Sequence, residues 1–520
     1  MMKGFFIIIL SGSFIPFQLA AQTVSPPTIE WQRSFGGTNG DVASCIRQTS
    51  DGGFVVGGYS GSDVSGNKTS ANFGHLDYWL IRLDKDGNKL WDFSFGGDDA
   101  DILTDIQLTA DGGFLLAGFS YSPASGNKSS PSFGGSDFWI VRVDAGGHKL
   151  WDKSYGTTNS ESLWSVQMLN DGGLILAGHV FYASVPADWW ILRIDAIGNI
   201  VWERTLGGNN LDQVPVVRIM PNGDLCIAGS SYSPVSGDRT SSIYAEDYWL
   251  VRLDENGNKL WDKTYGGNSN DHLFSLELTA EGGLLLGGSS SSTTDSNKTS
   301  PFFGQDLGMG DFWVVLVDGS GNKIWEKSFG GSSSEILGQV IQTPDGGFIV
   351  GGRSASPPSG NKTSPFYGGI YDGDAWVVRL DREGNKLWEQ SYGGTGSDHL
   401  DGIAVTPDGG IILANTSRSP ADGNKTVPSF GFQDIWVVKL GPDSLLRPPQ
   451  LQVHPADVLL SGFRLLLEGV SNQNYVVEAS TDFITWTAIQ TNRLSATCAE
   501  FLDVSATNLP RRFYRARPVP

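Results

Sequence analysis

Acidic residues recur at one position of a repeated segment, and carboxylates in such a pattern could bind a cation. In the first copy the segment reads SFGGTNGD, and an acid falls five residues after the first Gly in all seven copies. Because Ca²⁺ takes carboxylate ligands, one interpretation is a calcium site formed by this acid ring. The alternative, which seven equivalent copies favour, is that each carboxylate accepts N–H bonds within its own loop. The acids are Asp41, Asp101, Glu161, Asp212, Asp271, Glu335 and Asp398.

One repeat has a much shorter link after its second predicted strand. The Gly and Asp that bound this link are ten residues apart in the third repeat, at 178 and 188, but 19 apart in the first, at 58 and 77. A notch floored by aromatic residues beside taller loops would suit a ligand. The alternative, a plain deletion with its aromatics packed inward, is the one that the sequence favours. The candidate ligand-binding residues are His179, Phe181 and Tyr182.

The remaining polar residues do not form a recognisable catalytic or metal motif. None of the six His has metal-ligand spacing or repeats as a triad partner would. His272 and His399 each follow a ring acid, which allows a site at a channel mouth but favours solvated loop residues. The SGNKTS-type links lack the GxxxxGK[ST] pattern of a phosphate loop, which argues against nucleotide binding. We therefore predict no catalytic residue and no organic cofactor, with calcium as the one possible ligand of the acid ring.

The basic residues of the SGNKTS-type links form a row of their own. Because they are predicted on the same face as the ring acids, we expect salt-bridged loops, which are worth little when exposed. The six residues are Lys68, Lys128, Arg239, Lys298, Lys362 and Lys425.

A tandem repeat must position these residues. Fourteen of the 17 Trp occupy two repeat positions, one in KLW segments and one in Asp-x-Trp segments. Apolar runs such as YWLIRL must be covered on both faces, as in stacked blades. We therefore predict an all-β chain whose main part, residues 28–442, is a seven-bladed β-propeller with Trp rows between neighbouring blades. In the first unit the predicted strands are Asp41–Thr49, Gly53–Ser60, Asp77–Asp84 and Asn88–Phe95.

The count of strands predicts how the ring closes. Seven DGG-type turns and seven Asp-x-Trp strands are present, but no KLW strand follows the last Asp-x-Trp strand, DIWVVKL. The missing strand lies at the other end, in WQRSFGG at residues 31–37. We expect it to pair with the last blade, which removes the exposed sheet edges of an open array.

The two ends of the chain carry separate signals. Residues 1–21 have a basic start, a short apolar run and small residues at Ala20-Ala21, as in a cleaved secretory signal peptide. No second apolar run is present, so we expect no integral membrane segment after cleavage. After a linker at 443–450, residues 451–520 alternate like the strands of a small β-sandwich. The three Cys fall at unrelated places, which predicts buried thiols rather than disulfides.

Two resemblances follow from these motifs. The order Tyr475, Trp486, Phe501-x-Asp503 and Phe513-Tyr514-Arg515 resembles a fibronectin type III-like module, of the kind found at the ends of secreted proteins of bacteria such as Verrucomicrobia. This resemblance implies a spacer or surface-presentation role. The DGG, DxW and DGNxxW repeats resemble bacterial secreted propellers and, distantly, pyrroloquinoline-quinone-type repeats, whose eight blades and Thr-Gly turns this chain lacks.

Composition limits the partners. A formal net charge of −20 disfavours nucleic acid and anionic membranes. The sequence favours a secreted or cell-surface, monomeric, non-catalytic scaffold that binds an extracellular glycan or protein through its long-loop face. A polysaccharide-degrading enzyme with channel-mouth carboxylates and a self-associating surface-layer component are the alternatives. The enzyme requires an acid–base pair that occurs in one blade only, and the sequence shows none.

Overall fold

In the computed structural model of this chain, every regular element of the described residues is a β-strand. The structure describes residues 25–182, 186–305, 310–369, 372–446, 450–459, 462–468, 474–481, 485–494, 498–503 and 513–519. The predicted signal peptide at 1–21 lies outside these residues. Within them, no helix has the length and hydropathy to span a bilayer.

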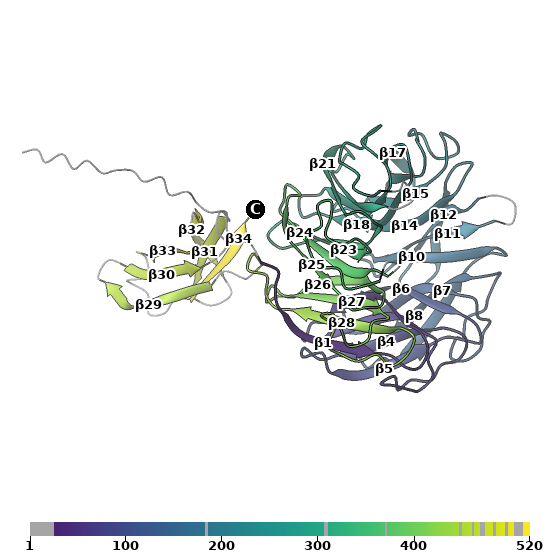
Figure 1. Cartoon of the computed structure of the whole chain (residues 1–520), viewed down its shortest axis with the longest axis horizontal. Helices are drawn as coiled ribbons and strands as arrows, with labels where there is room; N and C mark the ends of the chain where they lie inside the picture. The colour runs from purple at the N-terminus through teal and green to yellow at the C-terminus, as the bar shows by residue number, and fades with distance from the viewer. Residues whose placement is uncertain are drawn as a thin grey trace, which may run out of the picture.

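Seven four-stranded antiparallel sheets make up the repeated part of the chain (Figure 1). We number them sheets 1 to 7 along the chain; the first six each contain four consecutive strands. The predicted strands of the first unit match to within one residue at each end. The strands of sheets 1 to 3 are β2 (Asp41–Gln48), β3 (Phe54–Ser60), β4 (Asp77–Leu83), β5 (Lys89–Phe95), β6 (Asp101–Leu108), β7 (Phe114–Ser120), β8 (Asp137–Val143), β9 (Lys149–Tyr155), β10 (Ser160–Met168), β11 (Leu174–Phe181), β12 (Asp188–Ile194) and β13 (Ile200–Leu206).

Sheets 4 to 6 repeat the same order. Their strands are β14 (Asp212–Ile219), β15 (Leu225–Ser231), β16 (Asp247–Leu253), β17 (Lys259–Tyr265), β18 (Asp271–Leu278), β19 (Leu284–Ser290), β20 (Asp311–Val317), β21 (Lys323–Phe329), β22 (Glu335–Gln342), β23 (Phe348–Ser354), β24 (Asp374–Leu380) and β25 (Lys386–Tyr392).

Sheet 7 takes its fourth strand from the N-terminal end of the chain. It contains β26 (Asp398–Val405), β27 (Ile411–Ser417), β28 (Asp434–Leu440) and β1 (Ile29–Phe35), and β1 pairs antiparallel with β28. The predicted pairing of residues 31–37 with the last sheet is therefore present. In addition, the first strand of each sheet packs against the first strand of the next, and β26 packs against β2.

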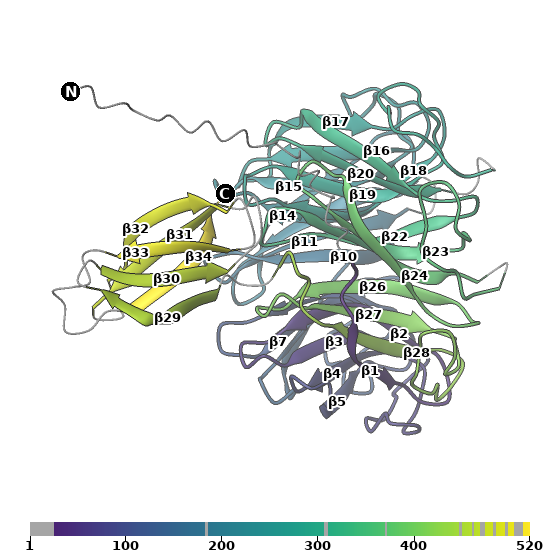
Figure 2. The same ribbon diagram turned by 60° about the vertical axis from the view of Figure 1, so that its left-hand side comes forward.

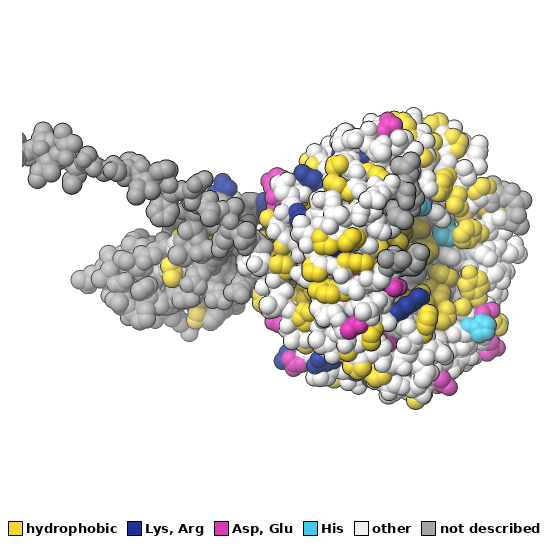
Figure 3. Space-filling view, in the orientation of Figure 1, with side chains coloured by type: hydrophobic (Ala, Val, Ile, Leu, Met, Phe, Trp, Pro, Cys, Tyr) yellow, Lys and Arg dark blue, Asp and Glu magenta, His cyan; other side chains and the backbone are white. Residues whose placement is uncertain are grey.

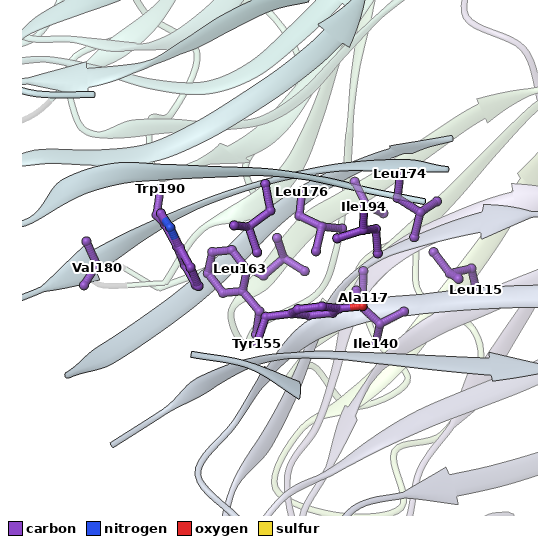
Figure 4. Close-up of a cluster of buried hydrophobic side chains, with 13 residues drawn as sticks. Leu115, Ala117, Ile140, Tyr155, Leu163, Leu174, Leu176, Val180, Trp190 and Ile194 are labelled. Carbon is purple, nitrogen blue, oxygen red and sulfur yellow. The ribbon is translucent and has the colours of Figure 1, made fainter. Parts of the chain in front are cut away.

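Apolar side chains fill the spaces between neighbouring sheets. In the described part of the chain, seven clusters of buried hydrophobic residues each join two neighbouring sheets, and one of them joins sheet 7 to sheet 1. Figure 4 shows the cluster between sheets 2 and 3, where Tyr155 of sheet 2 lies near Leu163 and Trp190 of sheet 3. The Asp-x-Trp row is buried throughout, so the predicted packing role of these Trp residues is confirmed.

Two three-stranded sheets form a separate group at the C-terminal end (Figure 2). Their orders are β29-β30-β33 and β32-β31-β34, and they share a small apolar core around Leu467, Val477 and Phe501. Cys45 and Cys226 of the repeated sheets are buried free thiols, as predicted. The strands of the C-terminal group are β29 (Gln450–Leu459), β30 (Gly462–Glu468), β31 (Asn474–Ser480), β32 (Thr487–Arg493), β33 (Cys498–Asp503) and β34 (Phe513–Val519).

Candidate functional site

The seven predicted ring acids are fully buried. Each lies at the start of the first strand of its sheet, with 0% of its surface exposed. Asp41 is representative: its Oδ2 accepts the Gly37 N–H at 2.8 Å and the Ser62 hydroxyl at 2.9 Å. All seven accept the N–H of the residue four positions earlier. These contacts match the alternative in which each carboxylate holds its own loop, and calcium binding stays a prediction.

Each ring acid also has a carboxylate neighbour that the sequence analysis did not pair with it. At the junction of sheets 1 and 2, Asp77 and Asp101 both contact Gly96; a Cβ there would lie 2.0 Å from one carboxylate and 2.7 Å from the other. The first Gly of every FGG-type link is therefore needed for space. Burial raises the pKa of Asp77 to about 7, with the Asp101 carboxylate adding to the shift. The seven carboxyl pairs are Asp77/Asp101, Asp137/Glu161, Asp188/Asp212, Asp247/Asp271, Asp311/Glu335, Asp374/Asp398 and Asp434/Asp41.

The six basic residues of the SGNKTS-type links are buried rather than exposed. Lys68 is 1% exposed; its Nζ donates to the Ser70 carbonyl at 2.7 Å and lies 5.8 Å from the ring centre of Trp79. The other five residues lie over the equivalent Trp at 5.6–5.9 Å. Carbonyl groups and an aromatic face stabilise the buried cation, where the sequence predicted salt bridges between the loops.

The notch residues belong to an aromatic cluster on the face that carries the long links. His179 stacks edge-on with Phe181 at 4.5 Å and lies 6.0 Å from Trp164, whose ring is 6.3 Å from Phe119. Tyr121 adds a further ring 6.1 Å from Phe119. We call these five residues the aromatic cluster. Figure 3 shows a hollowed face with apolar and histidine side chains beside the hollow.

The residues of the aromatic cluster differ in solvent exposure. Tyr121 and Phe181 are each 44% exposed and Trp164 is 37% exposed, so three rings from sheets 2 and 3 face solvent. His179 is only 3% exposed and accepts a hydrogen bond from Trp164 Nε1 at 3.2 Å. Burial lowers the pKa of His179 to about 4, so the ring is neutral and positions Trp164.

Aromatic side chains gather at the predicted notch, and ligand binding there stays a prediction. Tyr182 is half-buried and packs on the apolar core between sheets 2 and 3, while His179 lies beneath the surface. Trp164 was missed by the sequence analysis. It is one of only three Trp outside the two repeat rows, and that exception was the signal that could have found it.

Two other histidines have acidic partners that the sequence did not place beside them. His272 Nδ1 lies 2.7 Å from Oε1 of Glu246, and His399 Nδ1 lies 2.8 Å from Oδ1 of Asp401. The sequence favoured solvated loop residues, but His272 lies in β18 and His399 in β26, and both side chains are partly exposed. Glu246 comes from sheet 4 and His272 from sheet 5, so only folding brings them together. Among the described residues, no three His, Cys, Asp or Glu side chains gather in a way that could hold a metal ion.

Comparison with known proteins gives a distant relative and fold-level neighbours. No family model matches the chain. It is 25% identical over 383 residues to the regulatory protein FlaEY of Caulobacter vibrioides, covering 65% of this chain and 37% of that protein. The chain therefore spans little more than a third of this relative.

The solved structures that resemble the chain differ widely in sequence. The WD40 domain of Neurospora crassa Pan2 is 12% identical with a TM-score of 0.42, and the match covers 79% of this chain and 97% of that one. A protein of unknown function from Dyadobacter fermentans is 13% identical with a TM-score of 0.40, covering 80% and 98%. The β-propeller domain of the trilobed protease from Pyrococcus furiosus is 9% identical with a TM-score of 0.38, covering 72% and 92%.

Proposed function

We propose that the chain is a secreted, seven-bladed β-propeller that binds extracellular glycans through the aromatic cluster on its long-loop face. The observation that carries the proposal is the group of exposed rings of Tyr121, Trp164 and Phe181, held in place by the buried His179. Rigid aromatic faces offer large contact area at low entropic cost, and the apolar face of a sugar ring can lie against them.

The propeller assignment rests on the arrangement of the sheets. Seven four-stranded sheets repeat one strand order, the first and last sheets share an apolar cluster, and β1 completes the last sheet. We infer that the sheets are blades of a ring closed by β1. The C-terminal sheets fit a fibronectin type III-like spacer that presents the propeller at the cell surface after signal-peptide removal at about residue 21.

Replacing Trp164 tests the glycan site. We expect Trp164→Ala to weaken binding to the best ligands on a glycan array by roughly 10- to 30-fold, the loss typical of a central aromatic contact. The melting temperature should fall by only a few degrees, because Trp164 is 37% exposed and its main polar contact is one hydrogen bond to His179. The measurement is array binding of residues 22–520, with and without calcium, followed by calorimetry on the strongest hit.

Phe432→Ala is the matched control for this experiment. Phe432 is 64% exposed and lies against Arg418 in the long link of sheet 7, away from the cluster. Equal losses in both variants would argue against a specific site. An array without hits would shift the proposal toward a protein ligand or self-association, which sedimentation velocity distinguishes.

The enzyme alternative gains one specific observation. Glu246 and His272 form an acid–base pair at positions where no other repeat carries both an acid and a His, and a catalytic propeller requires such an unrepeated pair. Incubating array-positive oligosaccharides with the protein and analysing the products by mass spectrometry tests it. Cleavage that disappears in Glu246→Gln would favour an enzyme, whereas intact oligosaccharides would favour the binding scaffold.

A further inference from the structure

A cavity lies on the long-link side of sheets 5 and 6, away from the aromatic cluster. Its volume is about 460 Å³, within the range of small-molecule sites. Its lining is mixed: hydroxyl, amide and imidazole groups lie beside the apolar side chains of Phe274 and Ile336. The lining includes Asn270, His272, Phe274, Ser289, Ser291 and Ser334.

His272 is the anchored group of this cavity. Its Nδ1 lies 2.7 Å from the carboxylate of Glu246, which is itself fully buried. The His272 side chain is 40% exposed, and its ring stacks with Phe274 at 6.3 Å and 30°. The imidazole therefore has one nitrogen fixed in the protein, and the rest of the ring borders the cavity.

The pair occurs once in seven repeats. Glu246 precedes the Asp of an Asp-x-Trp strand, a position where an acid is found in no other repeat. A buried carboxylate in that place costs free energy unless it is paired. The other six repeats have no acid at this position. The corresponding residues are Leu76, Ser136, Ala187, Gly310, Gly373 and Gln433.

We propose that this cavity binds one neutral, hexose-sized sugar unit, with His272 donating a hydrogen bond from Nε2 and Phe274 packing on the sugar face. The proposal rests on the proposed glycan-binding function and adds a second, independent subsite to it. The side chains of Asn270 and Ser334 suit the hydroxyl groups of a sugar, because each can both donate and accept. The hydroxyls of the other two Ser residues in the lining already bond to the protein. A volume of about 460 Å³ accommodates such a unit with bridging water.

Charge selects a neutral ligand over an acidic one. The charge of a protonated His272 is already balanced by Glu246, and Asp271 and Glu335 lie beside the same cavity. With a net charge of −20 on the whole chain, a uronate carboxylate would enter an unfavourable potential. A neutral sugar meets no such penalty.

The pH dependence of binding follows from the same contacts. The hydrogen bond to Glu246 raises the pKa of His272, Asp271 adds to the shift, and partial burial opposes it. Protonated His272 can donate from both nitrogens, whereas neutral His272 that keeps its bond to Glu246 has only an acceptor at Nε2. Binding should therefore weaken as pH rises through the pKa of His272.

Calorimetry with defined oligosaccharides tests the proposal. The probes are cellotetraose, mannotetraose, xylotetraose and maltotetraose as neutral ligands and tetragalacturonate as the acidic one. We expect a neutral probe to bind at pH 6 and to bind roughly tenfold more weakly in His272→Ala or at pH 8.5, the loss of one charge-assisted hydrogen bond. His272→Gln, which keeps a donor, should retain most of the affinity and lose the pH dependence.

His399→Ala is the matched control. His399 occupies the same strand position in sheet 7 and pairs with Asp401, but it does not line this cavity. Unchanged binding in His272→Ala, with loss in Trp164→Ala, would overturn this inference and leave the proposed function intact. Loss in His272→Ala with full binding in Trp164→Ala would support the inference and overturn the aromatic site. Preference for tetragalacturonate would overturn the neutral-sugar assignment, and no binding by any probe would overturn the subsite.

Discussion

Removing residues 25–35 is expected to lower the melting temperature of all seven repeated sheets together, by roughly 10–20 °C. β1 fills the fourth position of sheet 7 and pairs with β28 from Trp31 to Phe35. Phe35 is 3% exposed and belongs to the apolar cluster that joins sheets 7 and 1. Without β1, that junction loses its outer cover and the edge of β28 is left unpaired, so the first and last sheets can separate.

One side chain of β1 also forms three hydrogen bonds with residues of sheet 7 and its long link. Gln32 Oε1 accepts hydrogen bonds from Trp436 Nε1 and the Thr426 N–H, both at 3.1 Å, and its Nε2 donates to the Asn424 carbonyl at 2.9 Å. In other sheets an acid of the KLWD or KLWE segment takes this place, as Asp92 does beside Trp79. Gln32→Ala should therefore reproduce part of the loss.

Differential scanning calorimetry measures the effect. Truncation after residue 446 is the control, because it removes the C-terminal sheets and leaves the seven repeated sheets complete; its main transition should stay in place. Adding a synthetic peptide of residues 25–37 to the shortened protein should restore part of the melting temperature by strand addition. A shortened protein that melts with wild-type stability would show that β1 is not needed for closure.

The second large expected effect is the dependence of the melting temperature on pH. We expect the melting temperature to fall by roughly 10 °C between pH 5.5 and pH 8 in EDTA, because seven buried carboxyl pairs resist full ionisation. Burial, with a neighbouring carboxylate adding to it, raises the pKa to about 7 in Asp77 and Asp247 and to about 8 in Asp311. A raised folded pKa stabilises the protein at low pH, and that stabilisation disappears as pH rises from about 4 through the folded value.

Carboxylates whose pKa is lowered do not change the expected loss of stability between pH 5.5 and pH 8. Burial alone would raise the pKa of Asp92, but hydrogen bonds from Lys89, Thr69 and Trp79 lower it below its usual value. Such a group loses its stabilising contribution only in strong acid, well below the window of the measurement. The two classes together predict greatest stability in mildly acidic solution.

The Asp77→Asn variant isolates the contribution of the Asp77/Asp101 pair to the pH dependence of stability. The amide is neutral at every pH and can donate to Asp101, so the variant should match wild type near pH 5 and exceed it by roughly 1 kcal/mol at pH 8. Asp98→Asn, an exposed residue of the same link, is the control and should follow wild type throughout. A flat wild-type profile in EDTA would contradict the prediction. Restoration of stability at pH 8 by calcium would instead support the metal site predicted from the ring acids.

Local patterns carried much of the architecture. The Trp rows, the Gly turns and the count of KLW strands predicted the strands of the first unit to within one residue and the pairing of β1 with the last sheet. These features recur seven times, and a strand sandwiched between sheets must be apolar on both faces, so the pattern is visible in the sequence alone.

Contacts between repeats were decided only by the tertiary structure. Seven equivalent acids suggested a shared ring, yet each is buried beside the Asp of a neighbouring strand at a Gly that leaves no room for a Cβ. The six link cations were expected to form salt bridges with acids but lie over Trp rings. Sequence spacing could not show either outcome, because both depend on how one sheet packs against the next.

The residues that now carry the functional proposals are those that break the repeat. Trp164 and His179 come from different strands of sheet 3, while Glu246 and His272 come from different sheets. The sequence by itself determined a repeated all-β architecture, because the buried positions of each sheet recur as apolar residues at regular intervals along the chain. Only the tertiary structure decided which exceptions meet, because side chains far apart in the chain become neighbours through the packing of the sheets and not through any local rule.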